Sequence, residues 1–572
     1  MKRDSVIIIG GGLGGLECGY ILAKNGMKVT VVEQEPQVGG CLQTFRRGNA
    51  LFDTGFHYVG AMKEGESLHT LFSYFGLTDL PWKQLDEDGF DEVVIDGKSY
   101  AFANGHSRFV ETLAHSFPHE REGLKKYTTF LKQVGDHIFD GLTGETDSTF
   151  SHSLFARSAH EFLNETIHDP LLHKVLSGTS LKMELNAPTL PLYTFAQIND
   201  SFIRSAWRLQ GGGSQLTDKL AESIRAMGGE VRTHSRVTCM TEEEGRIKGV
   251  VINGEDYIEA DWFVSSTHPA HTVTLVGESQ KMRRIYRRRI TNLENTFGMF
   301  TANIRLKPDC LPYLNKNLFI HRPDADLWNV RPQRTESVLV HYTVPQDGSL
   351  YTPGIDLLSP MSWAEVEKWA THPVGRRGED YVAYKQEKTE ACLRLVEARL
   401  PQLRQVIDHI YTSTPLSYNS YIASAEGCAY GIRKDYNNPL LTVLTPKTPL
   451  PNLLQTGQSL NLHGVLGVSM TAFFTCAEIL GMDKIKEIIN HKSNEVCISY
   501  RRKPWNWTGR LCEIGPNGIL CGGKLRIERC RSPKNTSAHS RSRKRGRTVE
   551  IRCEQHNRKR CSIGRLARSP SG

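Results

Sequence analysis

Three glycines and one acid near the start of the sequence have the types and spacing of a phosphate-binding site. Gly10, Gly12 and Gly15 form a GxGxxG pattern directly after the apolar run 6–9, and Glu33 ends the next apolar run. In such a loop the first glycine permits a tight turn, the second lets a pyrophosphate approach the backbone, and the third allows close helix–strand packing. The helix start favours phosphate, and the acid binds ribose hydroxyls. The pattern predicts FAD or NAD rather than NADP, because the acid disfavours a 2′-phosphate.

The elements that must position these residues follow in the right order. Residues 6–9 form a fully apolar run, as in a central strand of a parallel sheet. Apolar residues then recur at helical spacing over 13–23, Gly26 is placed to end the helix, and 27–32 indicate a second strand. A lone GxGxxG is weak evidence, whereas strand, loop, helix, strand and acid together predict a Rossmann-type α/β unit.

Two further features favour FAD. The glycine pair Gly39-Gly40 lies shortly after Glu33, and residues 52–60 read Phe-Asp-Thr-Gly-Phe-His-Tyr-Val-Gly. The glycine pair resembles the extended fingerprint of two-dinucleotide flavoproteins. Together with Cys41, the two segments resemble the carotenoid/retinoid oxidoreductases, above all the retinol-saturase branch of all-trans-retinol 13,14-reductases. Carotenoid isomerases and phytoene desaturases are the neighbouring branches.

The resemblance continues at four later places and implies a fold. It covers a glycine-rich turn at 211–213 with a helix to Ala226 and a strand over 230–237, a strand over 260–266, the segment 414–431, which contains Tyr430, and the segment 452–467 followed by a helix to about Leu480. It implies an α/β protein in which a two-dinucleotide-type FAD-binding Rossmann domain carries an inserted α+β substrate domain. The residues that the fingerprint and the resemblance assign to the cofactor are Gly10, Gly12, Gly14, Gly15, Glu33, Gly39, Gly40, Val237, Gly457, Gly464 and Gly467.

The FAD-binding domain is therefore expected to be discontinuous. Its predicted segments are 1–60, 205–280 and 415–490, and the substrate domain is predicted from 61–204 and 281–414. Helical stretches are expected around 107–128, 160–176 and 363–371. Their apolar faces fit a pocket for a lipophilic substrate, although for any single residue a place in the core is the more usual explanation.

Flavin chemistry on an isoprenoid double bond needs few side chains, because the cofactor carries the hydride and the protein supplies position, dryness and a proton donor. We therefore expect no catalytic triad and no metal, and the sequence contains no HExxH motif. The resembling motif makes His57 and Tyr58 the candidate catalytic residues, with Tyr430 behind them; the alternative for each is a hydrogen-bonded packing role. His463 departs from the glycine or cysteine expected just before Gly464.

The electron partner and the direction of the reaction stay open. The sequence has no second GxGxxG with a strand before it and an acid after it, so either NAD(P)H binds at the flavin face or another protein or a quinone exchanges electrons. The same flavin site can saturate a double bond, create one or isomerise it. The resemblance implies saturation of a polyene or isoprenoid lipid, with a desaturase or isomerase as the alternative. A flavin amine oxidase shares the first motif but lacks support at 53–60.

The charge of the chain is divided unevenly along its length. The 572 residues contain 71 Lys and Arg against 62 Asp and Glu, a net charge of +9, and 21 of these basic residues but only 5 of the acidic ones lie in 491–572. Such a tail suits a nucleic acid or an anionic membrane, or else is a solvated disordered segment. We favour disorder, because apolar periodicity ends after Ile489 and the six cysteines of the tail lack metal-ligand spacing. A nucleic-acid-binding protein is the alternative from another class, and deletion of the tail would separate the two.

The remaining signals concern location. With 39% apolar and 23% charged residues, the composition excludes a collagen-like, wholly disordered or polytopic membrane chain. The run 6–9 is too short for a secretory signal, and the seven cysteines before residue 491 form no CxxC pair, which predicts free thiols in the cytoplasm. The basic run 283–289 has apolar neighbours and fits either a peripheral contact with an anionic membrane or, more usually, a solvated helix face.

Overall fold

The structure is a computed structural model, and it describes residues 4–48, 50–143, 149–331, 334–345 and 348–499. These residues belong to one compact unit that spans Met1–Arg501. The predictions made for the tail beyond residue 499 lie outside the described residues. The helix α18 (Met482–Ser499) continues past residue 490, so the predicted start of the tail falls inside a helix.

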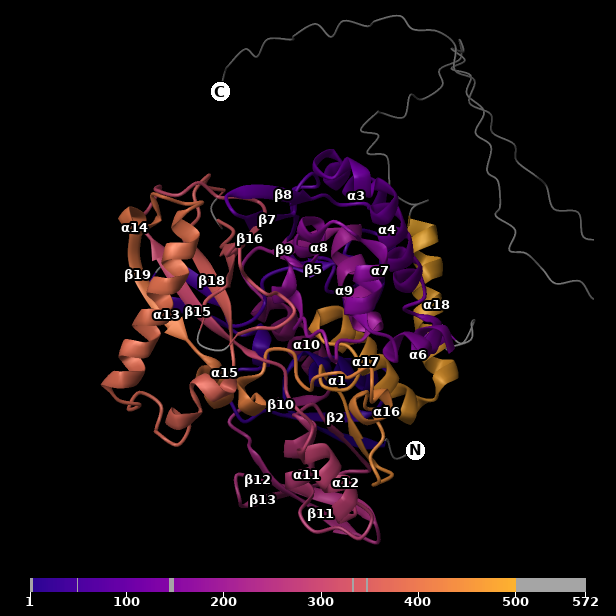
Figure 1. Cartoon of the computed structure of the whole chain (residues 1–572). Helices are drawn as coiled ribbons and strands as arrows, with labels where there is room; N and C mark the ends of the chain where they lie inside the picture. The colour runs from indigo at the N-terminus through magenta and orange to yellow at the C-terminus, as the bar shows by residue number, and fades with distance from the viewer. Residues whose placement is uncertain (1–3, 49, 144–148, 332–333, 346–347, 500–572) are drawn as a thin grey trace, which may run out of the picture. The chain divides into compact units, whose positions relative to one another are not determined.

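A five-stranded parallel sheet contains the predicted Rossmann strands (Figure 1). Parallel pairing buries both faces of such a sheet, which is why residues 6–9 are all apolar and almost fully buried. Strands from three distant parts of the sequence meet here. Their order is β10 (Glu230–Arg232), β2 (Lys28–Val32), β1 (Ser5–Ile9), β14 (Trp262–Ser265) and β20 (Leu453–Gln455).

Three helices pack together beside this sheet. The helix α1 (Leu13–Lys24) contacts both α10 (Ser214–Ala226) and α17 (Gly464–Leu480). The first follows the glycine loop as predicted, and the chain leaves it through Gly26, whose φ of +89° favours glycine. The predicted helix after Gly464 is confirmed by α17.

The predicted strand over 230–237 is wrong as a single element. β10 ends at Arg232, and β11 (Val237–Glu243) begins a separate antiparallel sheet with β12 (Arg246–Ile252) and β13 (Asp256–Glu259). The break comes at His234, whose φ of +52° turns the chain, and the N–H of Ser235 then donates to the carbonyl of Glu33 at 2.7 Å. Two helices accompany this small sheet in Figure 1, α11 (Pro269–Val276) and α12 (Arg284–Thr291).

A seven-stranded mixed sheet forms the second large layer of structure. The helix α13 (Glu379–Glu397) packs against two strands of this sheet, β16 (Asn317–His321) and β17 (Ser337–Tyr342). Neighbouring strands of this sheet are antiparallel except for β16 and β7 (Asp91–Ile95), which run parallel. The strand order is β19 (Ile407–Ser413), β15 (Gly298–Leu306), β18 (Gly354–Met361), β17 (Ser337–Tyr342), β16 (Asn317–His321), β7 (Asp91–Ile95) and β8 (Lys98–Phe102).

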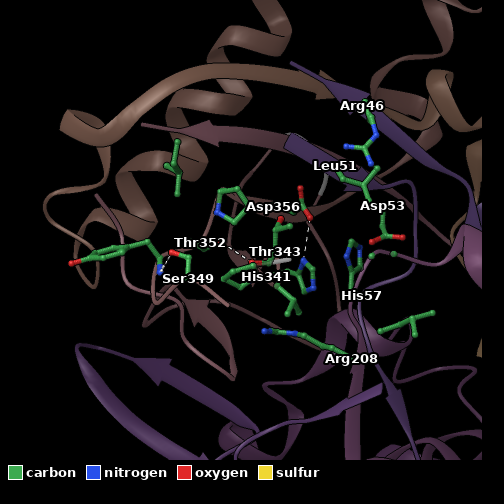
Figure 2. A pocket seen from close by; sticks show the side chains of 18 of the residues that line it. Arg46, Leu51, Asp53, His57, Arg208, His341, Thr343, Ser349, Thr352 and Asp356 are labelled. Atoms are coloured by element: carbon green, nitrogen blue, oxygen red, sulfur yellow. Dashed lines mark hydrogen bonds and ion pairs between the residues drawn. The ribbon is translucent and has the colours of Figure 1, made fainter. Parts of the chain in front are cut away.

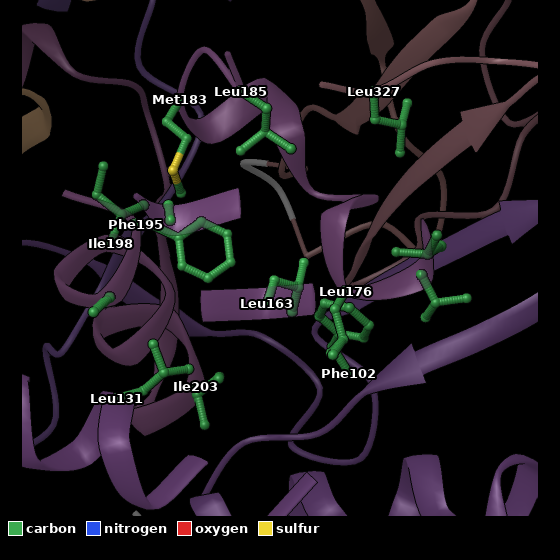
Figure 3. Packing of buried hydrophobic residues seen from close by; sticks show 14 of the residues in the cluster. Phe102, Leu131, Leu163, Leu176, Met183, Leu185, Phe195, Ile198, Ile203 and Leu327 are labelled. Carbon is green, nitrogen blue, oxygen red and sulfur yellow. The ribbon is translucent and has the colours of Figure 1, made fainter. Parts of the chain in front are cut away.

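Two of the three helical stretches predicted from periodicity exist but are interrupted, and the prediction of a helix over 363–371 is wrong. Pro118 breaks 107–128 into α3 (His106–Ser116) and α4 (Arg121–Asp136), because proline cannot continue the hydrogen-bonding pattern of a helix. The stretch 160–176 likewise splits into α7 (Ala159–Thr166) and α8 (Pro170–Ser177), and 363–371 forms only short 3₁₀ turns. With α9 (Leu192–Arg204), these helices enclose the apolar core of Figure 3, which includes Phe102, Leu131, Leu163, Leu176, Phe195 and Leu327.

Short elements connect these layers and hold the 52–60 segment in place. Val59 pairs with Trp207, which fixes the segment next to the strand before the second glycine-rich turn. Among the described residues, no helix is both long and apolar enough to span a membrane, and the seven cysteines before residue 491 have free thiols. The remaining elements are β3 (Thr44–Arg47), β4 (Ala50–Asp53), β5 (Val59–Gly60), β6 (Trp82–Gln84), β9 (Ala206–Leu209), α2 (Ser67–Phe75), α5 (Asp140–Thr143), α6 (Thr149–Phe155), α14 (Leu403–Val406), α15 (Pro415–Ile422) and α16 (Pro439–Thr442).

Candidate active site

The first glycine loop has the geometry that a pyrophosphate needs. Gly10 has a φ of +98°, and α1 begins directly after Gly12. A Cβ added to Gly15 would collide with the carbonyl oxygen of Gly10, so a larger residue would open the loop. The first N–H groups of α1 follow a loop made of glycines, which lets a phosphate approach them.

The acid at the end of β2 lies against this loop. Glu33 is 8% exposed, and its Oε2 accepts a hydrogen bond of 2.7 Å from the N–H of Gly11. Burial raises the pKa of its carboxyl group, while hydrogen bonds from the Glu35 and Gly11 backbone oppose that shift. The structure thus brings the predicted ribose-binding acid and the predicted phosphate-binding loop into direct contact.

Two more predicted glycine positions lie beside the loop. The N–H of Gly39 donates to the carbonyl of Gly11 at 2.8 Å, and a Cβ on Gly40 would lie 3.7 Å from the Cα of Gly12. Gly457 is close on another side, 3.4 Å from a Cβ built on Gly14. Three separate segments without side chains therefore meet, and the residues present fit the dinucleotide part of FAD.

The other predicted cofactor residues lie farther along the chain. Gly464 begins α17, and a Cβ on Gly467 would collide with the carbonyl of Leu462. Val237 is buried at the start of β11, in the small antiparallel sheet, and not at the end of one strand over 230–237 as predicted. The proposed contacts of Gly464, Gly467 and Val237 with FAD are predictions.

His463, which departs from the family pattern, is tied to the protein. Its Nε2 lies 3.2 Å from the carbonyl oxygen of Lys182, and its ring centroid is 4.6 Å from that of Tyr430. Burial lowers the pKa of its imidazole to about 4, so the ring is neutral at neutral pH. It adds no charge to the start of α17.

The two candidate tyrosines make hydrogen bonds within the protein. Tyr58 Oη donates to Oδ2 of Asp91 at 3.0 Å, and the same carboxylate lies 2.7 Å from Nζ of Lys182. Tyr430 Oη donates to the carbonyl of Leu181 at 2.5 Å. Burial raises the pKa of both phenols. Both side chains fit the packing alternative.

His57, by contrast, faces a polar cluster at a cavity of about 370 Å³ (Figure 2). Its ring nitrogens are buried without a hydrogen-bond partner, and its ring centroid is 4.9 Å from that of His341. His341 Nδ1 lies 3.1 Å from Oδ2 of Asp356. Burial, followed by the neighbouring His341, lowers the pKa of His57 to about 3, whereas burial raises that of Asp356 to about 6.

Asp53 stands between this cavity and a larger one of about 870 Å³ and lines both. Its Oδ1 accepts a hydrogen bond of 2.7 Å from the N–H of Gly213, in the second glycine-rich turn. Burial raises the pKa of Asp53 to about 8, with a contribution from the Asp356 charge. The 52–60 segment therefore supplies a wall to both cavities.

The larger cavity is connected to the cofactor motif by direct contacts. Tyr418, which lines it, donates its Oη to the carbonyl of Thr54 at 3.2 Å. The next residue, Gly55, lies against Cys41, and a Cβ built on it would be 3.4 Å from the Cys41 carbonyl oxygen. The cavity also has an aromatic and basic wall, with Phe45, Arg47, Arg377, Tyr381, Lys385, Tyr411 and Tyr421 among its lining residues.

Sequence reasoning did not single out His341, Asp356 or Tyr418. A signal was present in the strands, because His341 and Asp356 are polar residues in otherwise apolar runs. A buried polar residue in such a run marks either a satisfied core position or a site. Nothing in the spacing of these residues says that they meet.

The chain is similar to known flavin-dependent proteins in both sequence and fold. The family described as flavin containing amine oxidoreductase matches residues 13–480. The chain is 25% identical to the all-trans-retinol 13,14-reductase of Rattus norvegicus, over 84% of this chain and 86% of that protein. It is 21% identical to the 4,4'-diaponeurosporene oxygenase of Staphylococcus aureus, over 49% and 60% of the two chains. A putrescine oxidase with a redesigned cofactor site shares the fold, with a TM-score of 0.55 and 14% identity over 85% of this chain and 99% of that one.

These comparisons confirm the resemblance drawn from residues 39–41 and 52–60. The fold is of the flavin amine oxidase type, with mixed α/β content. The predicted division into FAD-binding and substrate domains stays a prediction, since the described chain forms one compact unit.

Proposed function

The chain belongs to the flavin-containing amine oxidoreductase family, and we propose that it saturates a carbon–carbon double bond of a polyene or isoprenoid lipid. It is an FAD-dependent oxidoreductase. Relatives named all-trans-retinol 13,14-reductase, from rat and from human, align with most of the chain at 25% identity, and this supports saturation. A desaturase or isomerase on the same fold is the second candidate. We also propose the finer architecture, a two-dinucleotide-type FAD domain with an inserted α+β substrate domain.

The observation that carries this proposal is the cavity of about 870 Å³ beside the cofactor motif. Its volume lies within the range of roughly 300–1,000 Å³ found for small-molecule sites. Aromatic rings of Phe45, Tyr411 and Tyr421 line it and suit a flat, conjugated chain. Tyr418 and Thr54 connect it to the segment that contacts Cys41.

The residues of the chain have assignable roles toward the cofactor. When bound, FAD supplies hydride-transfer chemistry. The start of α1 would hold the pyrophosphate and Glu33 the ribose. The start of α17, at Gly464, has the partial positive charge that stabilises negative charge on a reduced ring system.

Saturation also needs a proton, and Tyr418 is our candidate to hold it. Its Oη lies 3.1 Å from Oγ1 of Thr301 as well as donating to Thr54. Burial raises the pKa of Tyr418 to about 12, so its hydroxyl stays protonated at neutral pH. His57 is less suited, because its neutral imidazole has no acidic proton to give at neutral pH.

The electron donor is proposed to be NAD(P)H, bound directly at the larger cavity. Arg377 supports this, because its side chain lines that cavity and its Nε has no hydrogen-bond partner in the protein. Arg47, Arg376 and Lys385 line the same cavity and would favour an anionic pyrophosphate. An external protein or quinone donor is the alternative.

The deciding experiment is an anaerobic absorbance measurement on the purified holoenzyme. With NADH or NADPH added, bleaching of the flavin bands followed by their return when retinol is supplied would support a reductase. Bands that persist with both nucleotides would contradict direct hydride delivery and favour the desaturase, the isomerase or an external donor. Oxidation of putrescine in place of retinol turnover would instead identify an amine oxidase.

The location of the enzyme in the cell is also proposed. We propose a cytoplasmic enzyme that contacts membranes peripherally, since a polyene lipid is extracted from a bilayer. The support is α12, where Ile285 is 81% exposed and no acidic residue lies between Glu278 and Glu294. Nucleic acid is not a proposed partner.

A further inference from the structure

Three polar side chains converge on one point at the inner wall of the smaller cavity. His341 on β17 and Asp356 on β18 are direct cross-strand partners, and His57 approaches from the loop between β4 and β5. Their potential ligand atoms all lie within 4.8 Å of one another. Figure 2 shows the two imidazoles and the carboxylate gathered at the wall of the cavity.

The hydrogen bonds of the cluster are incomplete. Both ring nitrogens of His57 are buried without a partner. His321, a buried histidine two strands away from β18 in the same sheet, differs in this respect: its Nδ1 lies 2.8 Å from Ser337 Oγ and its Nε2 lies 2.7 Å from the Gly178 carbonyl. A buried polar group without a hydrogen-bond partner destabilises the folded state. A bound ligand would give the His57 nitrogens the partner that the protein itself does not supply.

The other two side chains are held from behind. Asn303 on β15 lies opposite Asp356 in the sheet and donates its Nδ2 to Asp356 Oδ1 at 2.7 Å. The ring of His341 also makes a hydrogen bond with the backbone of His57. Support of this kind fixes the orientation of metal-ligating histidines and carboxylates.

We propose that His57, His341 and Asp356 bind one divalent first-row transition metal ion. Two imidazoles and one carboxylate suit Zn²⁺ or Fe²⁺. Ligand atoms about 2.0–2.2 Å from a tetrahedral Zn²⁺ are roughly 3.3–3.6 Å apart, close to the 3.1 Å between His341 Nδ1 and Asp356 Oδ2. A small movement of the His57 ring completes the set.

The cavity beside the cluster is lined by acidic and basic side chains. Asp53 lines the same cavity and adds a second acidic side chain, close enough to Asp356 for the two charges to interact. The buried Arg208 also lines it; its guanidinium donates to the carbonyls of Leu314 and Lys316 and to Oδ1 of Asn317, and its positive charge acts on all three proposed ligands. With three protein ligands, the ion keeps an open position for water or a substrate oxygen from the cavity.

The test is a metal titration of the full-length, FAD-loaded protein without a histidine tag. After chelator treatment and dialysis, Zn²⁺ is added in competition with a chromophoric chelator, and bound zinc is measured by elemental analysis. One equivalent per chain is expected. His341→Ala should lose at least 100-fold in affinity, and Asn303→Ala should lose about 10- to 100-fold because it supports a ligand. Absence of zinc uptake by the wild-type protein would overturn the proposal.

Two controls keep the outcome specific. His321→Gln, which removes a buried histidine with both nitrogens bonded, should leave zinc affinity unchanged; an equal loss there would overturn the proposal. If His341→Ala does not fold, as judged by its flavin spectrum, wild-type protein loaded with Cu²⁺ can be studied by pulsed electron paramagnetic resonance. Two coupled imidazoles are expected, and none or one would contradict the site.

Discussion

The few side chains that are candidates for proton transfer owe their protonation states to the loss of solvent around them. Tyr418 is buried and His57 and His463 are partly buried, and the loss of solvent favours the neutral form of each side chain. Among them, Tyr418 is the one that lines the larger cavity with a proton to donate. Tyr418 therefore bears on turnover, and the buried Lys434 bears on stability.

We predict that Tyr418→Phe lowers turnover of the polyene by about 100-fold or more, the usual effect of losing a general acid. The cavity keeps its shape, so the flavin spectrum and substrate binding should be retained. Tyr421→Phe is the matched control, because Tyr421 lines the same cavity but is 57% exposed. Equal rates in wild type and Tyr418→Phe, measured by product formation, would exclude Tyr418 as the donor.

The second residue-scale prediction concerns Lys434. Its Nζ donates to the carbonyls of Thr442 and Ser459 at 3.0 and 2.6 Å, and burial lowers its pKa from 10.5 to about 7. Between these values the unfolded state binds more protons than the folded state, so Lys434 makes stability rise with pH. The penalty for burying the ammonium group is complete below pH 7 and is relieved toward pH 10.5.

Lys434→Met should remove this contribution. From pH 7.5 to 8.5 the wild-type protein should gain about 1.4 kcal/mol of unfolding free energy relative to the variant. Urea denaturation of both proteins at the two pH values measures the difference. Parallel pH profiles would mean that Lys434 does not titrate in this range.

Among the helices and strands, the sequence pattern predicted an element correctly where a glycine marks its beginning or its end. The helix after the glycine loop and the helix after Gly464 have the predicted extent. The failures have local causes too: Pro118 divides one predicted helix, and the turn at His234 divides one predicted strand. Periodicity detects an apolar face, but it does not register a single residue that redirects the chain.

The helix α12 is the element proposed to contact a membrane. Arg284 and Arg288 are both exposed on it, next to the exposed Ile285. Each basic residue near an anionic bilayer contributes about 1 kcal/mol, so the double variant Arg284→Gln/Arg288→Gln should bind anionic vesicles roughly 25-fold more weakly. Sedimentation with phosphatidylserine vesicles measures this.

Lys98→Gln/Lys126→Gln is the control, since it removes the same charge from two exposed positions elsewhere. Its vesicle affinity should match that of wild type. If both double variants lose affinity equally, net charge rather than α12 governs binding.

On the scale of the whole molecule, the features assigned to function lie before residue 500. Both large sheets, both cavities and all predicted FAD contacts belong to the described residues. We predict that a chain ending at Ser499 keeps its flavin spectrum and its polyene turnover. Loss of bound FAD on truncation would contradict this. Loss of salt-sensitive nucleic-acid binding, with FAD retained, would mark the tail as an appendage.

The amino-acid sequence alone predicted which residues hold the cofactor, because the requirements of such a site are local. A tight turn, a backbone without side chains and an acid at a strand end are properties of short segments, and Gly10, Gly15 and Glu33 express them directly. The same locality made the family resemblance visible in residues 39–41 and 52–60.

Only the tertiary structure decided what lies around that site. His57 meets His341 and Asp356 because β17 and β18 place the latter two side by side and the β4–β5 loop crosses their position. Tyr418 reaches Thr54 in the same way, from an element far along the chain. Such contacts depend on sheet order and register, which follow from the packing of the whole core rather than from any short segment.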